Sequence, residues 1–220
     1  QPNLDEKHLS QKQAYGSANR PPETGLAVLS SWISTYSQNE HNIKVINPNK
    51  SVDDIIADAS NSDVLGVTDW FSNHGNCISL ARESKRINPK LKVVFGGPNA
   101  SMMPSLLLRN HPYIDFVVSR DGEDAILGLV DNKPIKTISN LWHRANGEIR
   151  FTHQSYTDLK RMPLWDFSYH ENADTRLREY LETQTSGLDP WLVPPLTLFS
   201  FRGCMKAIKE GVCSYCTSAE

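Results

Sequence analysis

Lys92-Val93-Val94-Phe95-Gly96-Gly97-Pro98 is the stretch that decides the fold of this 220-residue chain. Its apolar run predicts a short buried strand, which the glycine pair and the proline end. The same pattern recurs on both sides: Val64–Thr68 and Asp115–Val118 are two further predicted strands. Apolar residues at helical spacing lie before, between and after these strands, so helices are expected there.

Short strands that alternate with helices favour right-handed βαβ units around a parallel sheet. We therefore predict a doubly wound α/β domain over residues 24–131, with Ile43–Ile46 as one more strand and the first strand nearly missing. Thr24 is expected to cap the first helix and Ser51 the second. The later helices are expected around Cys77, Leu106 and the segment 121–130.

The composition favours an ordinary soluble protein. The net charge is −2, with 39% apolar and 22% charged residues, which gives no electrostatic case for nucleic acid or an anionic membrane. No apolar run has the length of a membrane span, and the first residues lack a signal-peptide pattern. Four cysteines, two of them in a C-x-x-C pair, favour a reducing compartment. We expect a cytoplasmic protein without nucleic-acid or membrane partners; the sequence leaves the oligomeric state open.

The second part of the chain has a different pattern. Two apolar segments flank Asn146-Gly147, which is a strong hairpin signal. A segment rich in proline and aromatic residues and a short amphipathic helix follow. The apolar run Leu196–Phe201 then predicts a strand that leads directly to Cys204.

The carboxyl ends of the predicted strands are the expected ligand site, because ligands of doubly wound sheets bind there. Thr68 ends one strand and can offer a hydroxyl. Gly96 and Gly97 end the next and let a bulky ligand approach the backbone. A tight turn in which Ser101 caps the following helix is the alternative reading of the same residues.

Other polar side chains have simpler explanations. The carboxylates within Asp121–Asp124 suit the first turn of a helix, where the macrodipole favours acids. His74 and His111 are expected to be ordinary surface histidines, and Cys77 a small buried apolar residue.

Cys204, Cys213 and Cys216 form a C-x8-C-x2-C pattern that predicts a metal or cluster site. Three thiolates can fill three corners of a cubane iron–sulfur cluster and leave one iron open. A structural zinc site needs a fourth ligand, and the nearest candidate is the distant His170. The sequence favours the cluster and leaves zinc as the alternative.

Several motifs in order along the chain resemble the cobalamin-binding radical S-adenosylmethionine enzymes. Pro21–Ala27 resembles the family's entry to the first helix, and Lys92–Ser101 resembles its KVVxGGPHxS loop. Asp115–Glu123 is similar to its DYVVxGEGE stretch, and Asp158–Pro163 is similar to its interdomain linker. Phe201–Cys204 resembles the SRGC motif that opens the family's barrel. Asn99 stands where the family usually has histidine. The first two cysteines of the trio are five residues further apart than in the usual family spacing.

The resemblance implies roles for the cysteine segment and for the residues at the strand ends. The three cysteines would ligate a [4Fe–4S] cluster, with S-adenosylmethionine on the fourth iron and Tyr215 near its adenine. Thr68, Gly96, Gly97 and Ser101 would line the site of the corrinoid tail. The DxHxxG loop that supplies a cobalt-ligating histidine in other cobalamin modules is absent, so the resemblance implies cobalamin without a protein histidine on cobalt.

The resemblance also implies a domain plan. Residues 1–135 would form a flavodoxin-like cobalamin-binding domain, 136–194 a hairpin and linker, and 195–220 the start of a truncated radical S-adenosylmethionine (β/α) barrel. The implied enzyme cleaves S-adenosylmethionine to a 5′-deoxyadenosyl radical, for methyl transfer to an unactivated carbon of a small-molecule or natural-product substrate or for a related rearrangement. We expect no turnover from this fragment alone.

Two alternatives come from other classes of protein. One is a non-enzymatic corrinoid carrier whose terminal cysteines bind zinc or nothing. The other is a regulatory or nucleotide-binding module, which the lack of a glycine-rich phosphate loop disfavours.

Overall fold

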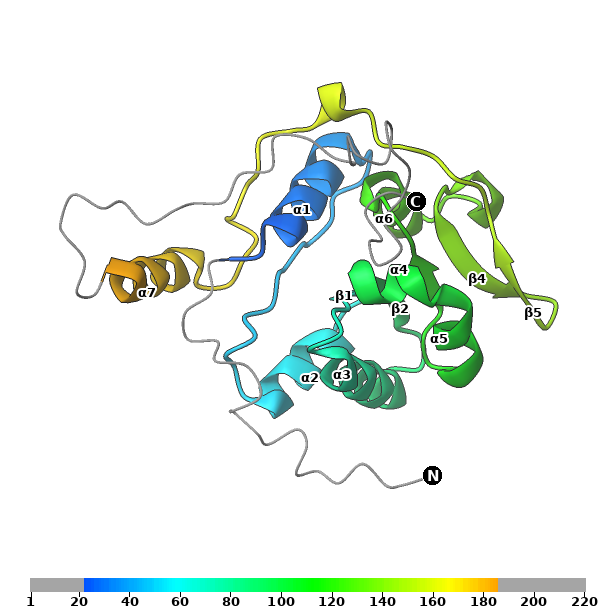
Figure 1. Cartoon of the computed structure of the whole chain (residues 1–220), viewed down its shortest axis with the longest axis horizontal. Helices are drawn as coiled ribbons and strands as arrows, with labels where there is room; N and C mark the ends of the chain where they lie inside the picture. The colour runs from blue at the N-terminus through cyan, green and yellow to red at the C-terminus, as the bar shows by residue number, and fades with distance from the viewer. Residues whose placement is uncertain (1–21, 186–220) are drawn as a thin grey trace, which may run out of the picture. The chain divides into compact units, whose positions relative to one another are not determined.

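The computed structural model describes residues 22–185, and a compact unit of the chain ends at Tyr180. Its described part contains a five-stranded sheet in the order β1-β2-β3-β4-β5 (Figure 1). The strands are β1 (Val64–Thr68), β2 (Lys92–Gly96), β3 (Phe116–Val118), β4 (Leu141–Ala145) and β5 (Glu148–Phe151). The predicted strands 64–68, 92–95 and 115–118 are therefore confirmed within one residue at their ends.

The sheet is mixed rather than purely parallel. β1, β2 and β3 run parallel, whereas β4 pairs with β3 in the antiparallel sense and β5 pairs with β4. The turn between β4 and β5 is the predicted one: Asn146 and Gly147 have φ of 53° and 80°, as a two-residue hairpin of the I′ type requires. The hairpin thus extends the sheet by two strands.

Helices cover both faces of the sheet (Figure 1). One face packs against α2 (Val52–Ser60), α3 (His74–Ile87), α4 (Pro98–Met102) and α5 (Pro104–Asn110). The other face carries α6 (Glu123–Val130), against which α1 (Thr24–Tyr36) packs. Val93 belongs to the first core and its neighbour Val94 to the second, because side chains alternate between the faces of a strand. The doubly covered α/β architecture is confirmed.

The segment Ile43–Ile46 is not a strand of this sheet, so that prediction is wrong. Only Val45 forms a bridge, and its partner is His170. Val45 donates to the carbonyl of Tyr169 at 2.7 Å and accepts from the amide of Glu171 at 3.0 Å. The pairing lies between segments far apart in sequence, which local apolar patterning cannot reveal.

The two predicted helix caps have different outcomes. The hydroxyl of Ser51 accepts from the amide of Asp54 at 3.1 Å, so the cap of α2 is confirmed. Glu23, and not Thr24, is the residue before α1, and no side chain caps this helix.

A 3₁₀ turn, η2 (Ile135–Thr137), lies between α6 and β4. After the hairpin, residues 152–172 lead to α7 (Ala173–Thr185) and contain a second 3₁₀ turn, η3 (Leu159–Arg161). Glu123 and Asp124 lie in the first turn of α6, as predicted. Glu123 is only 2% exposed and accepts from the hydroxyl of Thr157 at 3.1 Å, while Asp121 accepts from the amide of Thr157 at 2.9 Å. These carboxylates therefore tie the chain after the hairpin to the sheet.

No helix within residues 22–185 is both long and apolar enough to cross a membrane.

Candidate functional site

The four site residues predicted in the α/β domain gather at the carboxyl ends of its parallel strands. Thr68 and Gly96 are direct partners in the register of β1 and β2. Gly97 follows at once, and the hydroxyl of Ser101 accepts from the amide of Arg120, just beyond β3, at 3.3 Å. Three neighbouring strand ends thus meet at one edge, where doubly wound proteins bind their ligands.

The two glycines at this edge have different roles. Gly97 has φ of 94°, and a Cβ there would lie 2.9 Å and 3.0 Å from the backbone oxygen and nitrogen of Asp69. Gly97 is therefore required by its conformation and by the close approach of the two loops. At Gly96 a Cβ would meet only the carbonyl oxygen of Val118, at 3.9 Å. Gly66, in the middle of β1, has no described atom within 4 Å of a built Cβ, so open space lies beside the strand.

A buried polar cluster at the same edge was missed by the sequence analysis. The Asp69 side chain, with no exposed surface, accepts from His74 Nδ1 at 3.0 Å and from the amide nitrogen of Asn99 at 2.9 Å. His74 begins α3, and a third of its side chain is exposed. His74 is therefore not the ordinary surface histidine that its position in a loop predicts.

Hydrogen bonds hold the cluster in place. The amide of Asp69 donates to the carbonyl of Gly96 at 2.8 Å, and its carbonyl accepts from the amide of Asn99 at 3.1 Å. The Asn73 side chain accepts from the amide of Trp70 at 2.8 Å and donates to the carbonyl of Thr68 at 3.1 Å. The loop from residue 69 to residue 74, which we call the dyad loop, is thus tied to the ends of both β1 and β2.

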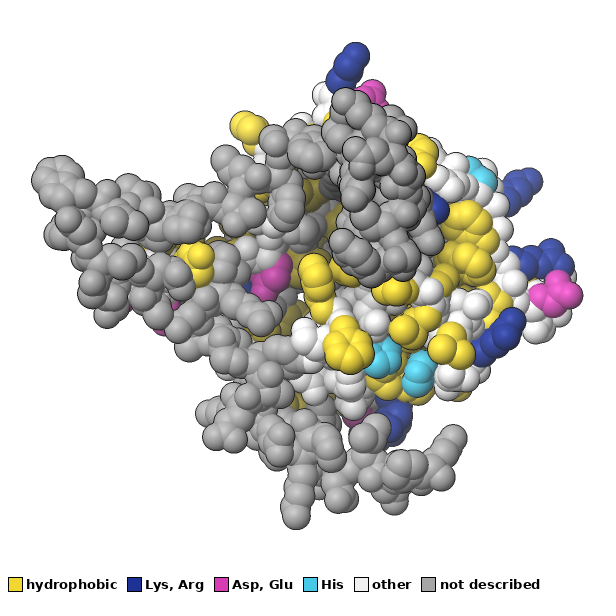
Figure 2. Space-filling view, viewed as in Figure 1, with side chains coloured by type: hydrophobic (Ala, Val, Ile, Leu, Met, Phe, Trp, Pro, Cys, Tyr) yellow, Lys and Arg dark blue, Asp and Glu magenta, His cyan; other side chains and the backbone are white. Residues whose placement is uncertain are grey.

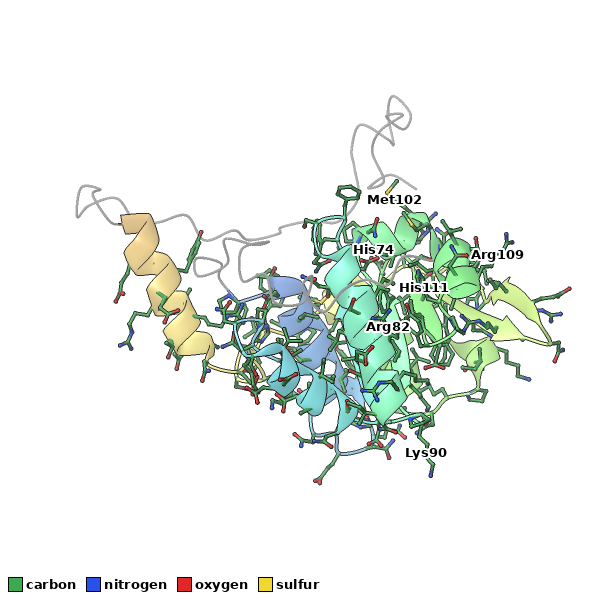
Figure 3. All side chains as sticks on the ribbon, turned by 90° about the horizontal axis from the view of Figure 1, so that it is seen from below. His74, Arg82, Lys90, Met102, Arg109 and His111 are labelled. Carbon is green, nitrogen blue, oxygen red and sulfur yellow. The ribbon has the colours of Figure 1, made fainter. Side chains whose placement is uncertain are left out.

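Exposed apolar side chains lie in the dyad loop and in the two helices after β2. Trp70 and Phe71 of the dyad loop are 54% and 91% exposed, and Met102 and Leu106 are 65% and 51% exposed. Figure 2 shows histidine atoms among hydrophobic side chains on this face. In Figure 3, His74 and Met102 lie at one end of the domain and Lys90, just before β2, at the opposite end. The dyad loop therefore has two exposed aromatic side chains in the same loop as the fixed imidazole.

Cys77 is the small buried residue that the sequence predicts, and His111 is a partly buried histidine. Cys77 is buried, and burial first and the charge of Asp69 second raise the pKa of its thiol to about 12. It is therefore neither a nucleophile nor a ready metal ligand. His111 bonds through Nδ1 to the hydroxyl of Tyr113 at 2.8 Å, and burial, followed by the nearby His74, lowers its pKa.

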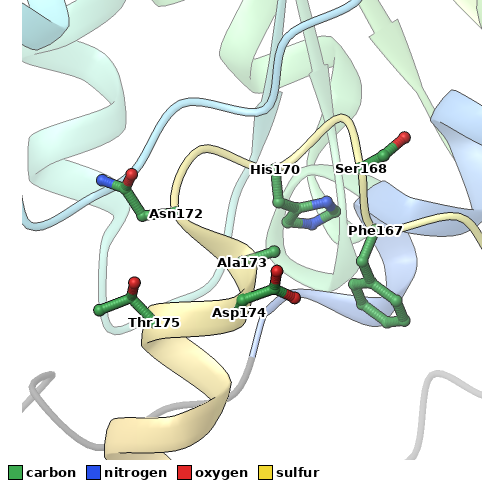
Figure 4. Close-up of a pocket in the computed structure, with 7 residues that line it drawn as sticks. All are labelled: Phe167, Ser168, His170, Asn172, Ala173, Asp174 and Thr175. Carbon is green, nitrogen blue, oxygen red and sulfur yellow. The ribbon is translucent and has the colours of Figure 1, made fainter.

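A cavity of about 460 Å³ lies before and along the first turn of α7 (Figure 4). It is lined by Phe167, Ser168, His170, Asn172, Ala173, Asp174 and Thr175. His170 is 4% exposed, its Nε2 lies 3.1 Å from the carbonyl oxygen of Glu23, and burial lowers its pKa. None of the predicted site residues lines this cavity.

Within residues 22–185 no group of three or more His, Cys, Asp or Glu side chains could hold a metal ion. The predicted cluster ligands Cys204, Cys213 and Cys216 and the predicted adenine neighbour Tyr215 lie outside this described range.

The comparison with protein families agrees with the position of the site. The B12 binding domain family matches residues 22–130, which include β1 to β3 and every helix that covers them. Residues 22–130 form a B12 binding domain. Thr68, Gly96, Gly97, Ser101 and the dyad loop all lie inside it, and the hairpin β4–β5 lies beyond it.

Two curated proteins are similar to this chain. An uncharacterized methyltransferase of Pyrococcus horikoshii is 33% identical over 138 residues, which cover 59% of this chain and 29% of that protein. The 2-(S-pantetheinyl)-carbapenam-3-carboxylate methyltransferase of Streptantibioticus cattleyicolor is 32% identical over 79 residues, covering 36% of this chain and 12% of that protein. The chain thus spans less than a third of the length of either relative.

Solved structures of a radical S-adenosylmethionine methyltransferase, TsrM of Kitasatospora setae, have a similar fold. The structure with cobalamin and a [4Fe–4S] cluster matches 66% of this chain and 28% of TsrM, with a TM-score of 0.52 and 15% identity. The structure with tryptophan and an S-adenosylmethionine analogue matches 61% of this chain and 27% of TsrM, with a TM-score of 0.50 and 17% identity. At this identity the likeness concerns the fold alone.

Proposed function

We propose that this chain binds cobalamin at the carboxyl edge of its sheet and belongs to a cobalamin-dependent radical S-adenosylmethionine methyltransferase. The observation that carries the proposal is the convergence of Thr68, Gly96 and Ser101 at one edge of a B12 binding domain. The names of the two curated relatives favour methyl transfer over a rearrangement.

The residues at this edge fit a large planar cofactor with an extended tail. No described atom lies within 4 Å of a Cβ position at Gly66, and at Gly96 the only one is the carbonyl oxygen of Val118 at 3.9 Å, so the tail has access to the backbone of β1 and β2. Trp70 and Phe71 offer exposed aromatic surface that a macrocycle can cover. The dyad loop is already held by hydrogen bonds, so little conformational entropy is lost when it orders around a ligand.

The remainder of the proposal concerns the cysteine segment. Cys204, Cys213 and Cys216 are the proposed ligands of a [4Fe–4S] cluster, and Tyr215 the proposed neighbour of S-adenosylmethionine. When bound, the corrinoid supplies the methyl group, and S-adenosylmethionine on the cluster supplies the radical that activates the substrate carbon. The proposed substrate is a small molecule or natural product, a class to which the name of the Streptantibioticus relative also points.

Cobalamin binding is tested on the full-length protein, purified without oxygen and titrated with hydroxocobalamin. We expect one corrinoid per protein, together with iron and sulfide in the proportions of one cluster. Thr68→Val removes the hydroxyl at the end of β1 and keeps the side-chain shape, so a several-fold loss of corrinoid affinity is expected, since one hydrogen bond is worth about 1 kcal/mol.

The matched control is Thr137→Val, at an exposed threonine of η2 outside the site, which should bind as the wild type does. Cobalt without iron would leave a corrinoid carrier, and zinc without cobalt would refute the proposed function.

A further inference from the structure

We infer that the cavity at the first turn of α7 binds a small organic cation, an amine in its ammonium form, between His170, Asp174 and Phe167. The residues that line this cavity all lie between Phe167 and Thr175, so the site shares no residue with the carboxyl edge of the sheet. The inference therefore goes beyond the proposed function and does not depend on it. The volume of about 460 Å³ is in the range of small-molecule sites.

The first argument is a buried nitrogen that has no partner. His170 is only 4% exposed, and its Nε2 lies 3.1 Å from the carbonyl oxygen of Glu23. Burial lowers the pKa of His170, so the ring is neutral at neutral pH, and Nε2 carries its proton because a carbonyl only accepts. Nδ1 then presents a lone pair, and within the described part of the chain no group donates a hydrogen bond to it. A buried acceptor without a donor costs free energy, and a ligand with an N–H group would remove this cost.

The second argument is the arrangement of the side chains around this ring. Figure 4 shows the imidazole of His170, the carboxylate of Asp174 and the ring of Phe167 around the same space. The rings of Phe167 and His170 pack with their centroids 5.3 Å apart and an angle of 49° between their planes. Asp174 and Thr175 are exposed, whereas His170 is buried. Because the rim residues are exposed, their side chains can turn aside and let a ligand reach the buried acceptor.

The third argument is the charge of the lining. Asp174 is the one charged side chain among the lining residues, and the neutral His170 adds a second acceptor. The guanidinium of Arg176 is buried and already bonded to Glu23 Oε1 at 2.9 Å. Asp174 also lies in the first turn of α7, where its carboxylate takes the place that the helix dipole would offer to an anion. The lining therefore favours a cation, and the face of the Phe167 ring adds a cation–π contact.

The same lining suits an organic cation better than a metal ion. His170 and Asp174 are the only His, Cys, Asp or Glu side chains among the lining residues, whereas a structural zinc site takes four ligands. Phe167 and Ala173 add apolar surface that a metal ion would not use. An amine that carries an apolar group contacts both kinds of side chain.

The experiment uses benzylamine as the probe, because this molecule joins an aromatic ring to an ammonium group. The full-length protein is titrated at neutral pH by isothermal titration calorimetry with benzylamine, with the neutral benzyl alcohol and with the anionic benzoate. We expect benzylamine to saturate one site. Benzyl alcohol should bind about two- to fivefold more weakly, which is the range for one exposed charge pair, and benzoate should not bind.

Two variants at exposed positions locate the site without a change in the core. Asp174→Asn removes the charge and should weaken benzylamine binding about two- to fivefold, to the affinity of benzyl alcohol. Thr175→Trp fills the mouth of the cavity and should abolish binding. The matched control is Asp53→Asn, which removes an exposed carboxylate from the first turn of α2 and should bind as the wild type does.

A third variant tests the buried acceptor. His170→Phe keeps an aromatic ring without the lone pair, and it should weaken benzylamine binding about fivefold, which corresponds to one hydrogen bond. A folded His170→Phe protein with the wild-type affinity would overturn the role of Nδ1. If this variant does not fold, the two exposed variants and the three probes still decide the point.

The other outcomes also overturn the inference. Absence of saturable benzylamine binding leaves the cavity without the proposed ligand. Benzoate binding as tight as that of benzylamine assigns the cavity to anions. Unchanged benzylamine binding in Asp174→Asn and Thr175→Trp places the probe elsewhere on the protein. Corrinoid binding is measured in separate titrations, so this inference and the proposed function can each fail alone.

Discussion

Gly97→Ala tests the close approach of the two loops that form the site. Gly97 has φ of 94° and ψ of 175°, a backbone region that is nearly restricted to glycine. An L-residue in that region costs about 1–3 kcal/mol. The added methyl group would lie 2.9 Å and 3.0 Å from backbone atoms of Asp69, and such overpacking costs about 1–3 kcal/mol more. The smaller entropy of the unfolded alanine chain returns up to about 1 kcal/mol.

The expected net loss is therefore about 1–6 kcal/mol in the free energy of unfolding. With a urea m-value of about 2 kcal/mol/M, the unfolding midpoint should fall by about 0.5–3 M. Circular dichroism during urea titration measures this shift.

Two other glycines separate the contributions. At Gly66 no described atom lies within 4 Å of a built Cβ and φ is not positive, so Gly66→Ala should leave stability within about 1 kcal/mol of the wild type. Gly128 lies within α6, and a Cβ there would lie 2.8 Å from Ile138 Cγ1. Gly128→Ala therefore tests crowding against a side chain without backbone strain. A Gly97→Ala protein as stable as Gly66→Ala would refute the reasoning.

Three further predictions concern other parts of the domain. Thr157→Val removes the hydroxyl that donates to the buried Glu123 and should cost about 1–3 kcal/mol in urea titrations, whereas Thr157→Ser should cost much less. Cys77, with its thiol pKa raised to about 12, should resist alkylation by iodoacetamide at about pH 8 until urea unfolds the protein. Mass spectrometry of the Cys77 peptide measures the labelling. Labelling of Cys77 in the folded protein would contradict this prediction. Burial lowers the pKa of His170 from its usual 6.5, so its neutral form supports the fold above about pH 6.5 and stability should fall as the pH drops from there toward the lower folded value. His170→Gln should flatten this part of the pH dependence of the urea midpoint, and an unchanged slope would argue against it.

The elements that the sequence predicted correctly are those with a local signal. Val64–Thr68 and Lys92–Phe95 are apolar runs ended by turn residues, and Asn146-Gly147 is a hairpin signal of two residues. The prediction failed for Ile43–Ile46, because the partner of Val45 is His170. No local pattern encodes a pairing across that length of chain.

The sequence predicted the part of the site that follows from the ends of the parallel strands. Thr68 and Gly96 follow from the rule that ligands bind at the carboxyl ends of parallel strands, and their register confirms that they meet. The sequence near His74 offers no second metal ligand and predicts an ordinary surface histidine, whereas the fold brings the Asp69 carboxylate to its ring. The signal was present: an aspartate directly after one strand, a histidine five residues on, and Asn99 after the next strand.

The sequence predicts that Gly96 and Gly97 let a ligand approach the backbone, but the geometry of Gly97 gives this glycine another role. The amide of Asp69 is bound to the carbonyl of Gly96, its carbonyl accepts from the amide of Asn99, and a methyl group at Gly97 would clash with both backbone atoms. Gly97 therefore has no free space for a ligand on the side of Asp69. Its absent side chain instead lets the dyad loop approach β2 closely enough for Asp69 to hold His74. The open space at this edge lies beside Gly66, where no described atom would come within 4 Å of a Cβ, and not at Gly97.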